Sequence, residues 1–302
     1  MTPTEVVTGS AGPFAAATPD GSRLHLQHGP IDLIVEGFGE QDEVGESYRR
    51  AWDRFRFVLD ELVQELPALR RPLDGYAFGG PVARRMAAAV EPFGDVFVTP
   101  MAAVAGAVAD EICAEMTACD LERAYVNDGG DIALWLTPGR SFEVGLVPVP
   151  HRPALLGTAT VREADPVRGI ATSGRHGRSF SLGIADAVTV LAPTAALADV
   201  AATLLANAVD LPGHPAVRRE PAAALAPDTD LGERLVTLEV GALDDREVAE
   251  ALASGVAEAE RMRAAGLLEA AVLCLDGRVG IVGPVVASAP PERASLHDGG
   301  DR

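Results

Sequence analysis

Asp199 and Thr203 stand four positions apart in the stretch LADVAAT. If this stretch is helical, the carboxylate and the hydroxyl lie on the same face. Oxygen ligands of this kind suit a hard cation such as Mg²⁺, which is often bound together with a phosphate-bearing substrate. A polar stripe, with the threonine hydrogen-bonded to its own helix, explains the same pair without any ligand.

The stretch NDGGD gathers Asn127, Asp128 and Asp131 around the pair Gly129 and Gly130. One explanation is an Asx-type hairpin turn, because glycine tolerates positive φ and asparagine hydrogen-bonds to nearby backbone. The other is close approach of a ligand to the glycine backbone, with Asn127 or Asp131 hydrogen-bonded to it. The sequence leaves both explanations open.

A third group of candidates lies in GIATSGRHGRSF, residues 169–180. Arginine side chains bind phosphate in a bidentate manner, and small residues expose backbone N–H groups to an anion. The candidate phosphate ligands are Thr172, Ser173, Gly174, Arg175 and Arg178. The alternative is a surface loop whose arginines pair with acidic side chains, which contributes little to stability. His176, between the arginines, is a weak candidate for a catalytic base.

The composition excludes several classes of function. The chain has 302 residues, a formal net charge of −19 and a hydrophobic content of 48%. This is the composition of a globular protein, and the negative charge disfavours nucleic-acid binding. All 25 basic residues are arginines, which excludes Schiff-base chemistry, a lysine base and a P-loop lysine. Cys113, Cys119 and Cys274 lack C-x-x-C spacing, which indicates reduced thiols rather than disulfides or a zinc site.

No membrane or export segment is predicted. The N-terminal stretch MTPTEVVTGSAGPF has neither the basic n-region nor the apolar h-region of a secretory signal. The longest near-apolar run, residues 192–209, is broken by Pro193, Asp199 and Asn207. We therefore expect a soluble cytoplasmic protein without membrane contact.

The periodicity of apolar residues predicts an α+β fold. Helices are expected over residues 46–66, 82–90, 101–118, 194–209 and 244–264, the first ended by Pro67. Strands are expected as a hairpin over 23–37, at 123–127, 131–136, 142–147, 155–161, 179–190 and 234–240, and around Asp276 and Gly277. Because the strands come in hairpins, we expect antiparallel sheets packed against helices. No G-x-G-x-x-G stretch opens a helix after a strand, so a Rossmann site is not supported.

We expect one domain over residues 23–288, preceded by a flexible N-terminus (1–22) and followed by a disordered tail (289–302). A Pro/Ala-rich link is expected over residues 211–232. The helix over 101–118 is built of unusually small residues, and Gly106 weakens it by about 1 kcal/mol relative to alanine. We therefore expect either a closely packed element or a flat ligand against this helix.

The order of these motifs resembles the ApbE-like family, which includes the FAD:protein FMN transferases. The resemblance rests on the small-residue helix, VNDGGDI, GIATSG, AVTVLAP and ALADVAAT, and covers residues 101–206. It implies an α+β fold of antiparallel sheets and helices, a bound Mg²⁺, and FAD or FMN as the nucleotide. It also implies a target flavoprotein, to which transferases of this family attach FMN through a Thr or Ser.

The resemblance also assigns residues. It places the metal carboxylate and hydroxyl on Asp199 and Thr203, and the backbone carbonyls of the metal site near Ala105 and Ala202. It places the flavin-nucleotide turn on Asn127, Gly129, Gly130 and Asp131, and the TSG turn on Thr172, Ser173 and Gly174.

Two departures from the transferases stand out. The helix start GGIAKGY reads AAVAGAV here, so that Gly106 occupies the lysine position. The His-Ile-Ile-Asp-Pro segment between the TSG and VTV strands is missing, and with it the catalytic histidine. The sequence therefore resembles a branch of the family that lacks the catalytic His segment.

Three functions remain open at this point. The first is a flavin- or nucleotide-phosphate-binding protein with Mg²⁺-dependent, transferase-type chemistry that is altered. The second is an active FAD:protein FMN transferase with a relocated base. The third is a non-catalytic accessory protein on the same scaffold.

Overall fold

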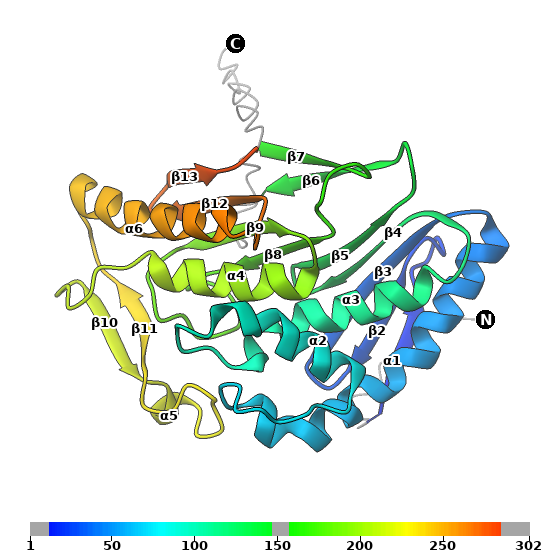
Figure 1. Cartoon of the computed structure of the whole chain (residues 1–302), viewed down its shortest axis with the longest axis horizontal. Helices are drawn as coiled ribbons and strands as arrows, with labels where there is room; N and C mark the ends of the chain where they lie inside the picture. The colour runs from blue at the N-terminus through cyan, green and yellow to red at the C-terminus, as the bar shows by residue number, and fades with distance from the viewer. Residues whose placement is uncertain (1–11, 147–156, 285–302) are drawn as a thin grey trace, which may run out of the picture.

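The computed structural model describes residues 12–146 and 157–284. These residues form a large antiparallel sheet with a layer of helices on one face (Figure 1). Every neighbouring pair of strands in the sheet is antiparallel. In spatial order the strands are β1 (Phe14–Ala17), β2 (Leu24–His28), β3 (Ile31–Gly39), β4 (Leu121–Asp128), β5 (Asp131–Leu136), β8 (Gly169–Ser173), β9 (Ala187–Ala192), β12 (Ala270–Leu275) and β13 (Arg278–Val282). The expected α+β class is confirmed.

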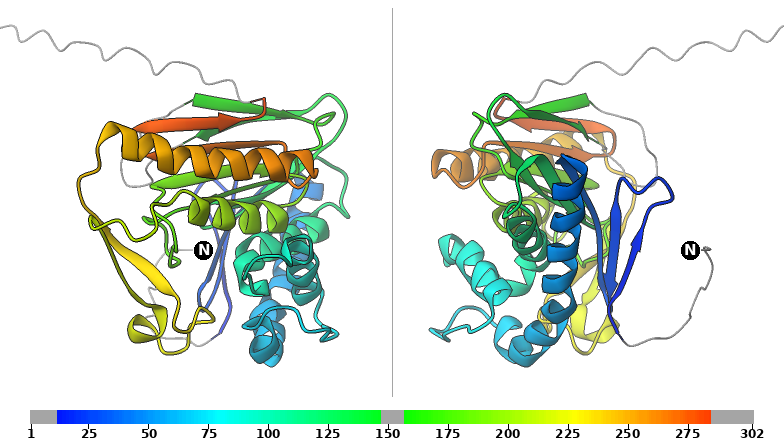
Figure 2. Two further views of the ribbon diagram at one scale, coloured as in Figure 1. Left: turned by 60° about the vertical axis from the view of Figure 1, so that its left-hand side comes forward. Right: turned by 90° about the vertical axis from the view of Figure 1, so that its right-hand side faces the viewer.

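Four helices cover one face of the sheet in the same order as the strands beneath them. Helix α1 (Gln41–Leu69) packs on β2 and β3, and α3 (Val104–Met116) packs on β4 and β5. Helix α4 (Ala195–Ala208) packs on β8 and β9, and α6 (Asp245–Ala264) packs on β12 and β13. Helix α2 (Pro81–Val90) packs against α3, and Figure 2 shows the arrangement from the side. Among the described residues, no helix combines the length and apolarity needed to span a membrane.

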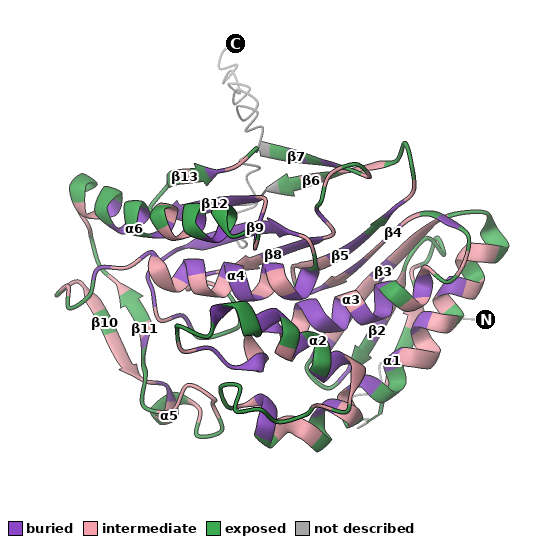
Figure 3. Ribbon diagram, viewed as in Figure 1, coloured by how far each residue is buried: buried purple, intermediate pink, exposed green. Residues whose placement is uncertain are grey.

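The opposite face of the sheet is covered in part by the hairpin of β6 (Ser141–Leu146) and β7 (Gly157–Arg162). Ala159 and Val161 of β7 pack with Leu134, Ile170 and Leu191 of the large sheet in a separate small core. Because both faces are covered at the centre of the sheet, β9 and β12 are buried at every position (Figure 3).

The segment expected as a Pro/Ala-rich link has secondary structure of its own. Strands β10 (Val217–Pro221) and β11 (Leu235–Val240) pair, and the short helix α5 (Ala222–Leu225) follows β10 directly. This arm is tied to the rest of the chain by a hydrogen bond from the Thr237 N–H to the Ser181 carbonyl (2.8 Å). Strand β10 was not predicted, because a strand in a two-stranded arm needs little apolar burial and therefore shows little alternation of apolar residues.

Three further boundaries differ from the sequence-based expectation. Helix α1 continues through Pro67 to Leu69, and the two residues after the proline, Ala68 and Leu69, are buried in the core. Strand β9 begins at Ala187 rather than at residue 179, because the preceding loop is held by the Asp186 side chain. Residues 14–17, within the N-terminus expected to be flexible, form strand β1 and pair with β2. Residues 1–11 and the tail 289–302 lie outside the described residues.

The small residues of α3 let it approach α4 closely. A Cβ on Gly106 would lie 2.6 Å from the Ala196 nitrogen and closer still to the Ala195 carbonyl oxygen. No side chain fits in that space, so glycine is required at this crossing. The Asp110 carboxylate of α3 also accepts hydrogen bonds from the N–H groups of Ala195 (3.0 Å) and Ala196 (2.9 Å). Of the two explanations for the small-residue helix, a closely packed element therefore holds.

Candidate functional site

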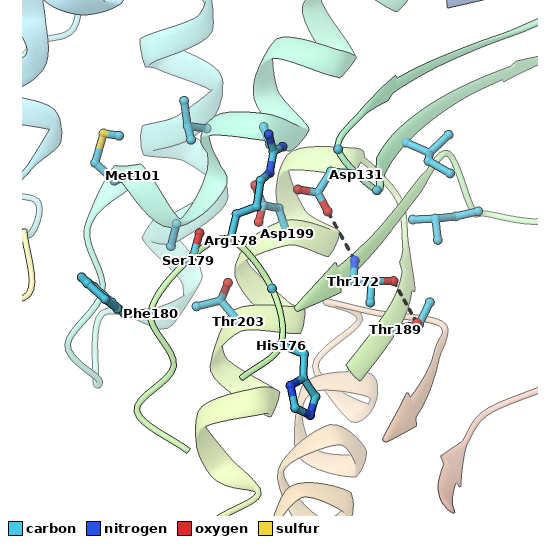
Figure 4. A pocket seen from close by; sticks show the side chains of 18 of the residues that line it. Met101, Asp131, Thr172, His176, Arg178, Ser179, Phe180, Thr189, Asp199 and Thr203 are labelled. Carbon is cyan, nitrogen blue, oxygen red and sulfur yellow. Dashed lines mark hydrogen bonds between the residues drawn. The ribbon is translucent and has the colours of Figure 1, made fainter. Parts of the chain in front are cut away.

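A cleft of about 900 Å³ lies between the helix layer and the β4–β5 turn. Figure 4 shows its lining from close by. Segments far apart in the sequence meet here, including the start of α3, the β4–β5 turn, β8, α4 and the loop before β9. Of the sequence-predicted site residues, those that line the cleft are Ala105, Asn127, Gly129, Gly130, Asp131, Thr172, His176, Arg178, Asp199 and Thr203.

Asp199 and Thr203 project from one face of α4 into the cleft, as their spacing predicts. Helix α4 begins after Thr194, whose hydroxyl accepts a hydrogen bond from the Leu197 N–H (3.1 Å). One Asp199 carboxylate oxygen accepts the Gly106 N–H (3.1 Å) from the first turn of α3. This bond fixes the orientation of a carboxylate that lines the cleft.

The β4–β5 turn has the Asx-type geometry that is one of the two explanations for the stretch NDGGD. The Asn127 side-chain oxygen accepts a hydrogen bond from the Gly130 N–H (2.8 Å), and Gly129 has a φ of 63°, as in an Asx-type turn. Asp131, which follows the turn, accepts a hydrogen bond from the Thr172 N–H (3.3 Å) across the sheet and faces the cleft. The turn is therefore held by its own hydrogen bond, and Asn127, Gly129 and Gly130 also line the cleft.

Three carboxylates near the cleft are destabilised in their ionised form. Burial raises the pKa of Asp128 to about 7. Burial, with the nearby Asp128 charge, raises the pKa of Asp131 to about 7. Burial and then the Asp131 charge raise the pKa of Asp199 well above its ordinary value. A bound cation would relieve this repulsion and the loss of hydration.

Thr172 and Thr189 face one another across β8 and β9, and their hydroxyls are 2.9 Å apart. Thr189 was not predicted as a site residue, although it is the one polar residue in the apolar strand AVTVLA. Its side chain is largely buried and lines the back of the cleft. A lone polar residue in a buried strand was the signal that sequence analysis overlooked.

The two arginines of the 169–180 stretch have different surroundings. The Arg175 guanidinium donates to the Asp186 carboxylate through Nε (2.9 Å) and an Nη (2.6 Å), and it does not line the cleft. Arg178 does line the cleft, and its side chain is 67% exposed. Of the two arginines expected to bind phosphate, only Arg178 lines the cleft, because the buried Asp186 holds Arg175.

Three more predicted residues do not line the cleft. Ser173 follows Thr172 on β8, and successive strand residues point to opposite faces. Gly174 approaches the backbone of Asp186, where a Cβ would lie 2.9 Å from the Ala187 Cα. Ala202 is fully buried in the core beneath α4.

His176 lines the cleft, and its Nε2 is 3.3 Å from an Asp186 carboxylate oxygen. Figure 4 shows the ring directed away from Asp131 and Asp199. The histidine and the metal-type residues therefore occupy different parts of the same cleft.

Several lining residues were not predicted as site residues. Met101 and Phe180 supply apolar surface, and Asp230 reaches the cleft from the arm between β10 and β11. The Thr99 hydroxyl donates to the Asp230 carboxylate, which ties the arm to the segment before α3. Asp230 lies outside residues 101–206, which explains why the sequence motifs did not include it.

The donors around Asp199 fit a hard cation. The cleft is lined by Asp131, Asp199, Thr203 and Ala105. Their carboxylates, hydroxyl and backbone carbonyl supply oxygen atoms, the type of ligand that Mg²⁺ prefers. Over residues 12–146 and 157–284, no group of three or more His, Cys, Asp and Glu side chains is arranged to hold a metal. A site here would therefore depend on the hydroxyl, the carbonyl and the ligand itself, as is usual for Mg²⁺ with phosphates.

A family model described as "AbpE bacteria" matches residues 15–281. This chain therefore belongs to that family. The UPF0280 protein of Methanopyrus kandleri is 38% identical over 172 residues, which cover 56% of this chain and 67% of the relative. The UPF0280 protein of Methanothrix thermoacetophila is 37% identical over 194 residues, which cover 60% of this chain and 75% of the relative. The expected ApbE-like branch is confirmed by the family match and these relatives.

Two solved structures are similar to this chain at low identity. A mutant of the flavin transferase ApbE from Vibrio cholerae has a TM-score of 0.47 at 13% identity, over 90% of this chain and 97% of that chain. The ApbE protein of Thermotoga maritima has a TM-score of 0.45 at 13% identity, over 85% of this chain and 96% of that chain.

Proposed function

We propose that this chain binds a flavin or another nucleotide phosphate together with Mg²⁺ in the cleft, and that its transferase-type chemistry is altered. The observation that supports this most is that Asp199 and Thr203 line the same cleft as Thr172 and Arg178. A carboxylate and hydroxyl for a cation thus lie beside an exposed arginine for an anion.

Each residue has a separate part in this proposal. Asp199, Thr203, Asp131 and the Ala105 carbonyl would hold Mg²⁺, whose role is to neutralise phosphate charge. The Arg178 guanidinium would pair with a phosphate oxygen. A protein with a net charge of −19 requires such local positive charge to retain an anion. Met101 and Phe180 offer apolar surface for a planar ring.

The experiment is a thermal-shift and calorimetric titration with FAD, FMN and ATP, each with and without Mg²⁺. A ligand at 100 times its Kd stabilises the folded state by about 2.7 kcal/mol. For a chain of this size that corresponds to an increase of about 4 °C in Tm. The shift is expected to require Mg²⁺ and to disappear in Asp199→Asn. If none of the three nucleotides with Mg²⁺ shifts Tm, the proposal fails.

Mass spectrometry of small molecules released from the purified protein tests which nucleotide is bound. Release of FAD or FMN would favour the flavin over other nucleotides. A tightly associated protein, recovered with no small molecule and no Mg²⁺ dependence, would favour the non-catalytic accessory role instead.

A second candidate is an active FAD:protein FMN transferase with His176 as a relocated base. The contact of His176 Nε2 with the Asp186 carboxylate (3.3 Å) favours it, because a carboxylate orients an imidazole for proton transfer. Co-expression with a target flavoprotein should then give covalent FMN on that target, and His176→Gln should abolish it. Unchanged labelling with His176→Gln would remove His176 from the reaction.

A further inference from the structure

Arg178 rests directly over the backbone of Gly129. A Cβ on Gly129 would lie 2.9 Å from the Arg178 Cζ, and still closer to one terminal nitrogen. Gly129 also has a φ of 63°, which L side chains rarely adopt. The second glycine of the turn, Gly130, has open space at its Cβ position. Glycine at position 129 therefore both makes the turn and leaves room for the guanidinium.

The position of Arg178 is set by charge rather than by a hydrogen bond. Its Nη2 is 3.9 Å from the Asp128 carboxylate, which is too long for a hydrogen bond. The Asp128 side chain is buried, whereas that of Arg178 is largely exposed. The same positive charge acts on Asp131 as well as Asp128, since it lowers the pKa of both. Arg178 is thus a loosely held counter-charge at the edge of these carboxylates.

Arg175 shows what a fixed arginine looks like in the same loop. Its contacts with Asp186 are 2.6 and 2.9 Å long, and its side chain is 24% exposed. Arg178 has a far longer contact and greater exposure, so it is free to move without breaking a short ion pair.

We propose that Arg178 is a displaceable counter-charge: docked over Gly129, it competes with a divalent cation for the carboxylates, and the incoming cation releases it to the anion. This inference rests on the proposed function, because it takes the cleft as a cation and phosphate site. It adds that cation binding and anion binding are coupled through one side chain.

Two consequences follow for binding. Removing the Arg178 charge should tighten binding of a divalent cation at least about fivefold, because the positive charges of the arginine and the cation repel one another. By linkage, cation and anion should each strengthen binding of the other. This coupling between cation binding and anion binding should weaken when the residue at position 178 carries no charge.

The experiment measures Mn²⁺ and Mg²⁺ affinity of the full chain by calorimetry, without any anion. Arg178→Gln should bind the cation at least about fivefold more tightly than the unaltered protein. Arg140→Gln is the charge-matched control, because Arg140 pairs with Glu122 (2.9 Å) outside the cleft. It should change the affinity by less than about twofold, since both groups are exposed and screened.

A second pair of variants separates position from charge. Gly129→Ala displaces Arg178 but keeps its charge, and should also tighten cation binding. Gly139→Ala is its control, because Gly139 has a φ of 81° but open space at its Cβ position. A thermal melt verifies that both variants are folded, and Arg178→Gln carries the test if Gly129→Ala is not.

The anion is tested with inorganic pyrophosphate as the probe. In the presence of Mg²⁺, Arg178→Gln should bind pyrophosphate about tenfold more weakly than the unaltered protein, the loss of one charge-assisted contact. Unchanged or weaker cation binding in Arg178→Gln would overturn the inference while leaving the proposed function intact. Equal cation binding in Asp199→Asn and the unaltered protein would instead overturn the proposed function, and the inference with it.

Discussion

Asp110 and Asp199 cap each other's helices. Asp110 of α3 accepts the N–H groups of Ala195 (3.0 Å) and Ala196 (2.9 Å) in the first turn of α4. Asp199 of α4 accepts the Gly106 N–H (3.1 Å) in the first turn of α3. Each carboxylate thus satisfies N–H groups that have no partner within their own helix. Asp199 differs from Asp110 in that it also lines the cleft.

This reciprocity gives a matched pair of variants. Asp110→Asn should lower the free energy of unfolding by about 1–3 kcal/mol, because both Asp110 oxygens accept an N–H and an amide has only one oxygen. Asp199→Asn should cost less, because its remaining oxygen can still accept the Gly106 N–H. Urea denaturation measures this loss. Mn²⁺ binding should persist in Asp110→Asn and be lost in Asp199→Asn. If both variants kept the cation equally well, Asp199 would be a cap and nothing more.

Gly106→Ala should destabilise the protein by about 2–3 kcal/mol or more, although alanine is the better helix former by about 1 kcal/mol. The reason is the overlap of a Cβ with the backbone of α4. Gly45→Ala is the control, because Gly45 lies in α1 with open space at its Cβ position. It should raise stability by up to about 1 kcal/mol, measured by the same denaturation. Equal effects of the two substitutions would contradict the close crossing of α3 and α4.

The stability of the metal-free protein should fall as pH rises from about 4 to about 7. Asp128 and Asp131 have their pKa raised to about 7 in the folded state, so they keep protons there that the unfolded chain has already lost. The folded state binds more protons in this window, and its stability therefore decreases with pH. Denaturation in EDTA between pH 4 and 8 measures the slope.

Asp128→Asn provides the control for this pH dependence, because it removes one of the two titrating groups. The slope between pH 4 and 7 should become shallower, and the protein should be more stable than the unaltered chain above pH 7. A slope that is unaffected by Asp128→Asn would mean that other groups are responsible.

The cysteines should differ sharply in reactivity. Burial raises the pKa of Cys113 to about 12 and that of Cys274 to about 11, so their thiolates are scarce at neutral pH. Cys119 is only half-buried. A thiol reagent such as 5,5′-dithiobis(2-nitrobenzoate) at pH 8 should modify Cys119 first in the folded protein. Cys119→Ser should then show little reaction until the protein is unfolded.

The regular parts of the fold were predictable because their signals are local. Helical spacing located α4 and α6, and the turn residues located the hairpins at Gly129 and Gly277. Strand β11 was predicted at residues 234–240, but its partner β10 was not, since a short strand with little burial leaves a weak alternation. Pro67 misled because the helix continues two residues beyond it, where Ala68 and Leu69 are buried.

The sequence predicted which residues of a single motif lie on one face, but it did not predict which residues of different motifs meet in the cleft. Spacing alone placed Asp199 and Thr203 on one face of a helix. Nothing in the local sequence distinguishes Arg175 from Arg178. They differ because the fold places the Asp186 carboxylate within hydrogen-bonding distance of Arg175. Thr189 and Asp230 join the cleft through sheet register and through the arm, both of which depend on long-range pairing.

The crossing of α3 and α4 also bears on how the chain is made. Gly106 and its partner Asp199 are 93 positions apart, so α3 emerges from the ribosome well before the helix that covers it. At a synthesis rate of about 5–20 residues per second, the alanine- and valine-rich surface of α3 remains exposed for roughly 5–20 s before α4 is made. Nascent chains halted before residue 195, where α4 begins, should therefore aggregate readily and depend on chaperones. Chains extended beyond residue 208, where α4 ends, can bury this surface.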